Sequence, residues 1–63
     1  MTTVIRLGGK DGRDQKVTEA VAEVTAALNV ARAQQHRFVA FTDAGSNKEI
    51  SVNPARVIDV FEE

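Results

Sequence analysis

The chain has 63 residues, no cysteine, one histidine and a formal net charge of −1. That length allows a single α+β domain over residues 1–63, the missing cysteines exclude disulfides, and one histidine argues against a closed zinc site. A small domain without these supports commonly relies on a partner subunit, so we expect a homo-oligomer, most simply a dimer. We expect no membrane span and a cytoplasmic location, because no apolar run reaches ~20 residues and the first residues lack a signal peptide's apolar stretch.

The first predicted element is a short strand over Val4–Leu7, which is rich in β-branched and apolar residues. The glycine-rich segment "GGKDGRD" then ends it. Its glycines and Asp-Gly step suit a hairpin loop, and Gln15–Thr18 could be the returning strand. The alternative is that Val17 belongs to the following helix.

A helix is predicted from about Glu19 to Gln34, with Thr18 as its N-cap. Apolar residues recur there at helical spacing and form one continuous stripe. A second, weaker apolar set lies on the opposite side of the helix and comprises Ala22, Ala26, Val30 and Ala33. Helix propensity explains the alanines but not Val30, so this side is a possible subunit contact.

A hairpin is predicted over Phe38–Asn53, with strands at Phe38–Thr42 and Glu49–Val52. The first strand is apolar on both faces, whereas the second alternates apolar and polar residues. Between them "DAGSN" consists of turn-forming residues.

The Asn53-Pro54 step can cap and begin a helix, or it can be a tight turn that leads into a strand. The segment "VIDVFEE" fits either a short helix or a strand. Its β-branched residues and short length favour a strand over Val57–Phe61.

Together these elements predict an antiparallel sheet of about four strands with one amphipathic helix packed on one face. The order is strand or hairpin, helix, hairpin, strand. The expected core consists of Val21, Val24, Leu28, Val39, Phe41, Ile50, Val52 and Ile58.

No arrangement of residues indicates catalysis or a cofactor. His36, Asp43 and Ser46 are close in sequence, but Asp43 and Ser46 occur in a segment that turn formation explains, so we expect no enzyme. The glycine-rich segment lacks the spacing of a Walker motif, a dinucleotide fingerprint or a calcium loop. We therefore expect no bound cofactor or metal.

The frame "TVIRLGG", "FVAFTDAGSNKEISVNP" and "RVIDVFEE" resembles small orphan proteins of actinobacteria and their phages. The resemblance covers nearly the whole chain and implies a small α+β fold with a phage or accessory role, without site residues to transfer. A weaker likeness is to small flagellar regulatory proteins, from which the long central helix departs.

Two functions from different classes fit the sequence. The first is a non-enzymatic interaction protein that uses an uncovered sheet face or edge strand to bind itself or another protein, with Phe38, Val57, Phe61 and Val30 at the interface. The second is a nucleic-acid accessory factor that uses the basic N-terminal loop. Its contact residues would be Arg6, Lys10, Arg13, Lys16, Arg32 and Arg37.

Overall fold

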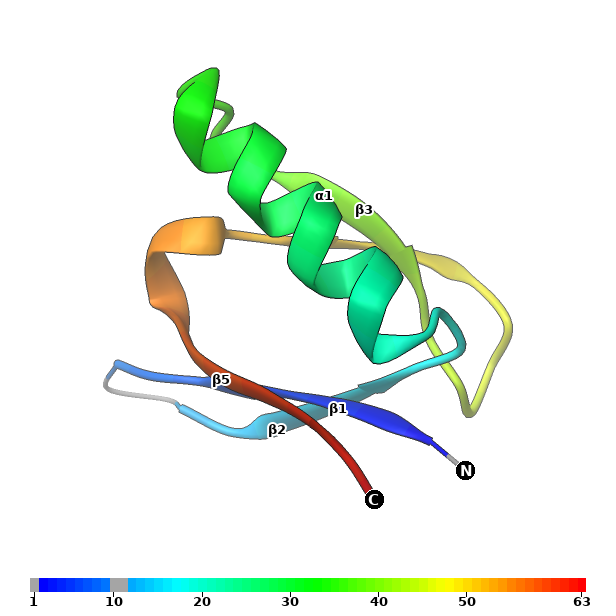
Figure 1. Ribbon diagram of the computed structural model, residues 1–63. Coiled ribbons are helices and arrows are strands. Elements are labelled where there is room, and N and C mark those ends of the chain that lie inside the picture. Colours follow the sequence, from blue (N-terminus) through cyan, green and yellow to red (C-terminus); the bar gives the residue numbers. More distant parts are fainter. Residues whose placement is uncertain (1, 10–11) are drawn as a thin grey trace.

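The computed structural model describes residues 2–9 and 12–63 and confirms an α+β fold (Figure 1). Five strands and one α-helix follow one another along the described chain, with one 3-10 turn before the last strand. They are β1 (Thr3–Leu7), β2 (Asp14–Val17), α1 (Val21–Ala33), β3 (Val39–Thr42), β4 (Glu49–Val52), the 3-10 turn η1 (Pro54–Arg56) and β5 (Val57–Glu62). The return strand after the glycine-rich segment and the final strand are therefore both present.

The strands form two antiparallel sheets, where the sequence predicted one sheet of about four strands. One sheet has the order β2-β1-β5 and the other is the β3-β4 hairpin. An isolated bridge between Val17 and Asp43 connects them, and Thr18 N–H donates to the Thr42 carbonyl at 3.0 Å beside it. In Figure 1, α1 lies in front of the β3-β4 sheet, and the three-stranded sheet lies below both.

The helix begins later than predicted. It starts at Val21 after Ala20, and no side chain caps it, so the prediction of Thr18 as N-cap is wrong. The reason is a competing interaction with β3: the Glu19 carboxylate accepts the Thr42 N–H at 3.0 and 3.1 Å. Because Thr18 and Glu19 both bond to Thr42, this short segment is held against the strand and cannot form the first helical turn.

The core lies between the helix and the two sheets. Its buried cluster is Ile5, Val17, Val24, Leu28, Phe41 and Val52, against which Val39 and Ile50 pack half-buried. Ile58 was expected in this core but is 68% exposed. The strand register explains the error, because Arg6 pairs with Asp59 whereas Leu7 pairs with Val57, which leaves Ile58 as the extra residue of a bulge.

The Asn53-Pro54 step combines the two predicted behaviours. Asn53 Oδ1 accepts the Ala55 N–H at 3.0 Å, and Pro54 begins a single 3-10 turn. That turn ends at Arg56, and the chain continues as a strand to Glu62. Capping chemistry is thus used for one turn, and the β-branched residues that follow extend into the sheet.

Candidate interaction surface

An apolar surface is exposed where α1 and β3 lie side by side. We define the α1–β3 surface by Ala26 and Val30 of the helix and by Phe38 and Ala40 at the strand. These residues line one shallow groove together with Ala27, Ala31, His36 and Val39. Val30 is 52% exposed and Phe38 is 61% exposed, so two of the large apolar side chains lie largely in water here.

Local structure explains both exposures. Val24, Leu28 and Ala31 face the core, which turns Val30 to the far side of the helix. After the helix, Gln35 adopts a left-handed φ of 58°, and the chain reverses toward β3. Phe38 precedes the first residue of that strand, on the opposite face from the core residue Phe41.

One edge of β3 borders this groove. Asp43 N–H donates to the Lys48 carbonyl at 2.9 Å, so Asp43, Phe41 and Val39 direct their backbone groups toward β4. Thr42 and Ala40 must direct theirs to the opposite edge. Thr42 uses Glu19 and Thr18 there, whereas the N–H and C=O of Ala40 have no partner among the described residues. The edge of β3 is therefore open for a short length beside Phe38.

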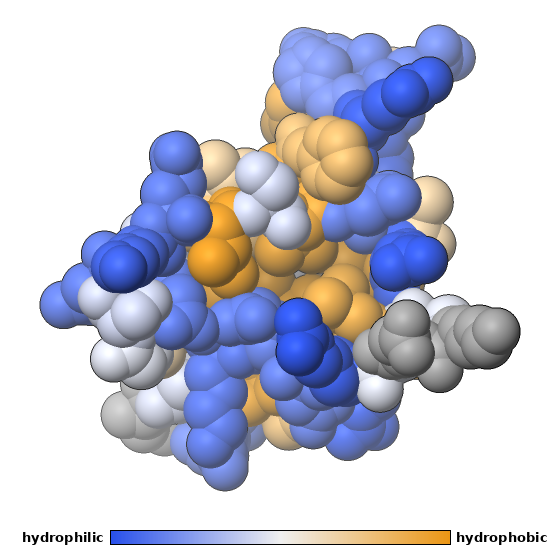
Figure 2. All heavy atoms as spheres, turned by 180° about the vertical axis from the view of Figure 1, so that it is seen from behind, coloured by the Kyte–Doolittle hydropathy of each residue, from blue (hydrophilic) through white to orange (hydrophobic). Residues whose placement is uncertain are grey.

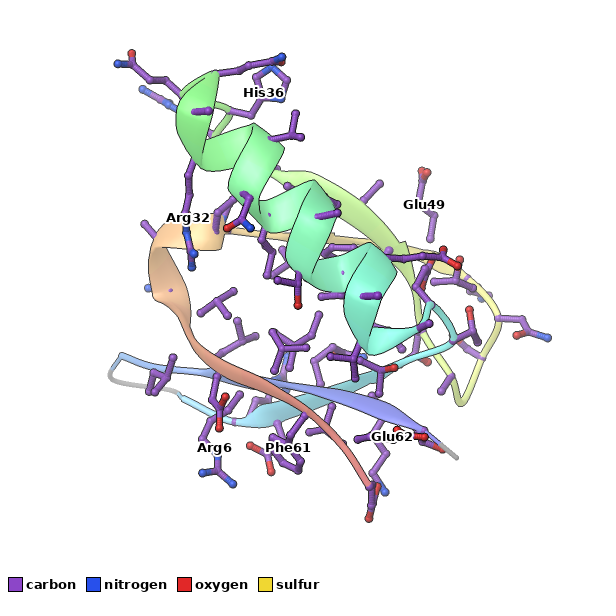
Figure 3. The ribbon with its side chains drawn as sticks, viewed as in Figure 1. Arg6, Arg32, His36, Glu49, Phe61 and Glu62 are labelled. Atoms are coloured by element: carbon purple, nitrogen blue, oxygen red, sulfur yellow. The ribbon has the colours of Figure 1, made fainter. Side chains whose placement is uncertain are left out.

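The charge along the groove changes sign from end to end. Arg32, His36 and Arg37 cluster at the C-terminal end of α1, where they line a second groove with Phe38. At the other end lie Glu19 and Glu23, and Glu49 pairs with Thr42 across the hairpin. Figure 3 shows His36 and Glu49 near opposite ends of the layer formed by α1 and the β3-β4 hairpin.

Glu19 is the acidic group with the most specific environment. The hydrogen bond from the Thr42 backbone N–H lowers the pKa of Glu19 below its ordinary value of 4.5. Glu19 therefore stays ionised at neutral pH while it ties the start of the helix to β3. Glu23 lies in the first turn of α1 and is exposed.

Figure 2 shows that hydrophobic side chains gather in a hollow bordered by polar ones on the face seen from behind. The half-buried apolar residues that pack against the core are Leu7, Ala27, Val39, Ile50, Val57 and Val60.

The other two predicted interface residues lie elsewhere. Val57 is half-buried and packs against the core opposite Leu7. Phe61 pairs with Val4 on the outer face of the three-stranded sheet, where the Arg6 guanidinium lies 5.1 Å from its ring centroid. The structure brings Phe38 and Val30 together but places neither Val57 nor Phe61 with them.

Charged side chains of the chain itself cover that outer face. Lys16 Nζ lies 3.1 Å from Glu63 Oε2, and Arg6 Nε lies 3.4 Å from Asp14 Oδ1. Val4 beneath them is 2% exposed. The second face of β5 is therefore occupied by a cation–π contact and two exposed ion pairs (Arg6 and Phe61 are labelled in Figure 3).

The predicted basic residues do not converge on one face. Arg6 and Lys16 are paired on the outer sheet face, and Arg13 lines a separate groove with Arg56. Arg32 Nη2 donates to the Pro54 carbonyl at 3.3 Å and lies with Arg37 near the helix end. Lys10 lies outside the described residues.

Asp43 and Ser46 form a turn, and the described residues show no hydrogen bond from either to His36. Asp43 Oδ2 accepts both the N–H and the Oγ–H of Ser46 at 2.8 Å. These two hydrogen bonds lower the pKa of Asp43, and the bond from Ser46 Oγ has the larger effect. The part of the chain that the structure describes holds no group of three or more His, Cys, Asp or Glu residues placed to bind a metal ion.

Sequence reasoning missed Ala40 as a contributor to the surface, and it did not place Ala26 beside Phe38. Ala26 belongs to the weak apolar set already noted, but its pairing with Phe38 depends on the position of β3. Ala40 matters through its backbone, which side-chain patterns do not report. The free edge follows from the strand register, and the register is a tertiary property.

The fold and this surface define a small α+β protein with an open edge strand. No family model, curated protein or solved structure matches the chain. None of the helices in the described ranges is long and apolar enough to cross a membrane.

Proposed function

We propose that this protein is a small non-enzymatic interaction protein of the cytoplasm, and that the α1–β3 surface binds either a second copy or an extended segment of another protein. The observation that carries the proposal is the exposure of Val30 and Phe38 beside the open edge of β3. An edge strand supplies backbone hydrogen bonds to an added strand, and neighbouring apolar side chains supply buried area.

The physical argument concerns the free energy of covering this surface. An exposed aromatic ring and an exposed Val lose no favourable contact when a partner covers them. Their burial contributes about 25 cal/mol per Å² of apolar area removed from water. By contrast, Phe61 is already covered by Arg6, so the outer face of the three-stranded sheet offers less. The resemblance of the sequence to small actinobacterial and phage proteins supports an accessory role.

Affinity capture from the host that encodes the protein tests this function. Bait proteins would be the wild type, Phe38→Asp, and Ile58→Asp as the control, because Ile58 is exposed to a similar degree outside the surface. We expect partners that the wild type and the Ile58 variant retain and the Phe38 variant loses. Identical sets of bound proteins for all three baits would refute the assignment.

A second candidate function is nucleic-acid binding at the C-terminal end of α1. Phe38 is exposed there beside Arg32, His36 and Arg37. An exposed ring among cations can stack on a base while the cations contact phosphates. Titration with mixed-sequence single strands at two salt concentrations tests it, and an absence of binding at low salt would eliminate it.

A further inference from the structure

The open edge of β3 has a geometry that suits its own copy. Ala40 directs its N–H and C=O outward, and by the same alternation Phe38 does so at the position before the strand begins. Val39, between them, uses its backbone groups toward β4. In an antiparallel pairing of two copies centred on Val39, Phe38 of each copy therefore lies opposite Ala40 of the other. The two pairs make about four backbone hydrogen bonds.

We propose that a second copy of this chain occupies the α1–β3 surface in a twofold arrangement, with the β3 edges paired antiparallel about Val39 and the two α1 helices side by side. This inference rests on the proposed function and commits it to one occupant. The result is a continuous four-stranded sheet, β4-β3-β3-β4, with Phe38 as an added strand residue. Such an isologous contact closes with two copies.

Side-chain sizes in this register are complementary. Phe38 and Ala40 occupy the same face of the sheet, so each exposed ring lies across the new strand pair from a small residue. On the helix, the stripe of Ala22, Ala26, Val30 and Ala33 carries one large side chain among small ones. Alanines at these positions let two helices approach closely, with Val30 near the axis.

The charges favour a second copy of this chain over an unrelated segment. An antiparallel twofold places the basic end of one groove, with His36 and Arg37, against the acidic end of the other, with Glu19 and Glu23. In the pairing centred on Val39, position 37 lies opposite position 41, next to the Thr42 N–H that Glu19 holds. Both ends of the contact are then complementary, as an isologous interface requires.

The strand register is tested by a cysteine substitution in a chain that otherwise contains none. Val39→Cys places two thiols at a non-hydrogen-bonded pair, about 4.5–5.5 Å apart between Cβ atoms, which is within reach of a disulfide. With glutathione disulfide as oxidant, we expect cross-linked dimer to form at least about tenfold faster than for Ile58→Cys. Equal rates for the two variants would overturn the register.

Sedimentation of the folded chain tests the charge pairing. The concentrations run from 10 µM to 1 mM, roughly the range of weak to moderate dimers. Arg37→Glu and Glu23→Arg should each raise the dimer dissociation constant about tenfold or more, since symmetry repeats the repulsion, and the double variant should recover most of the loss. Val30→Asp should abolish the dimer and Ile58→Asp should not. Circular dichroism would verify that every variant is folded.

The two proposals fail in different ways. A folded wild-type chain that stays monomeric throughout this range overturns the twofold arrangement, even if Phe38-dependent capture of another protein upholds the interaction surface. A double charge variant no better than either single variant also overturns it. If the chain is monomeric and capture is insensitive to Phe38, both proposals fall.

Discussion

Glu19 provides the most quantitative test of the fold, because one carboxylate connects the start of α1 to β3. Substitution by Ala removes the acceptor of the Thr42 N–H, whose two contacts measure 3.0 and 3.1 Å. A hydrogen bond to a charged group is worth about 1.5–3 kcal/mol, and partial exposure of this carboxylate reduces that to about 1–2 kcal/mol. With an unfolding entropy of ~2.1 cal/mol/K per residue, the expected fall in melting temperature is roughly 8–15 °C.

The pH dependence follows from the lowered pKa of Glu19. A carboxyl whose folded pKa lies below its unfolded value stabilises the fold above the unfolded value, and this contribution is lost as the pH falls through the folded pKa. The difference between wild type and Glu19→Ala should therefore be full at neutral pH and shrink below the ordinary value of 4.5. Glu19→Gln keeps a neutral acceptor and should be intermediate in stability.

Thermal unfolding followed by circular dichroism at neutral pH and at about pH 2.5, below the ordinary range of a carboxyl pKa, measures both effects. Glu49→Ala is the matched control, because Glu49 is exposed at the same end of the hairpin and makes no side-chain hydrogen bond among the described residues. If Glu19→Ala melted within about 2 °C of the control, or if their difference were the same at both pH values, the reasoning would be refuted.

Three further substitutions test the packing and the turns. Leu28→Ala should cost about 2–5 kcal/mol in urea unfolding because Leu28 is 3% exposed, and a cost as small as that of Ile58→Ala would contradict the assigned core. Asn53→Ala removes the acceptor of the Ala55 N–H and should cost ~1 kcal/mol, measured by thermal unfolding, whereas Asn53→Asp should retain most of the stability. Gly12→Ala would bring a Cβ to 2.7 Å from the Leu7 carbonyl oxygen, so the melting temperature should fall, and an unchanged value would show that this turn relaxes freely.

Much of the fold could be predicted from local pattern. The helical spacing of Val24, Leu28 and Ala31 identified the helix and its buried side, and turn-forming residues identified the β3-β4 hairpin. The β-branched residues after Asn53-Pro54 identified the final strand. These signals are strong because each depends on residues close together in sequence.

The errors arose where a distant contact overrides a local preference. Thr18 has the chemistry of an N-cap, but hydrogen bonds to Thr42 hold Thr18 and Glu19 outside the helix. Ile58 fits an apolar strand pattern, but a bulge opposite Arg6 and Leu7 turns it to solvent. The two sheets meet at a single bridge between Val17 and Asp43, and no local pattern encodes that contact.

Two of the four predicted interface residues, Val30 and Phe38, belong to the α1–β3 surface. Val30 was singled out because helix propensity did not account for it, and Phe38 because its strand was apolar on both faces. Phe61 looked equivalent in sequence, yet Arg6 from β1 covers its ring. Which aromatic side chain stays exposed is decided by cross-strand neighbours, and these follow from register.

The central position of β1 also constrains when the chain can fold during synthesis. β1 is made first, but one of its two neighbours is β5, with Thr3 opposite Glu62. At ~5–20 residues per second, several seconds separate the two strands on the ribosome. Until β5 is made, one edge of β1 lacks its partner strand, so the three-stranded sheet can be completed only at the end of synthesis.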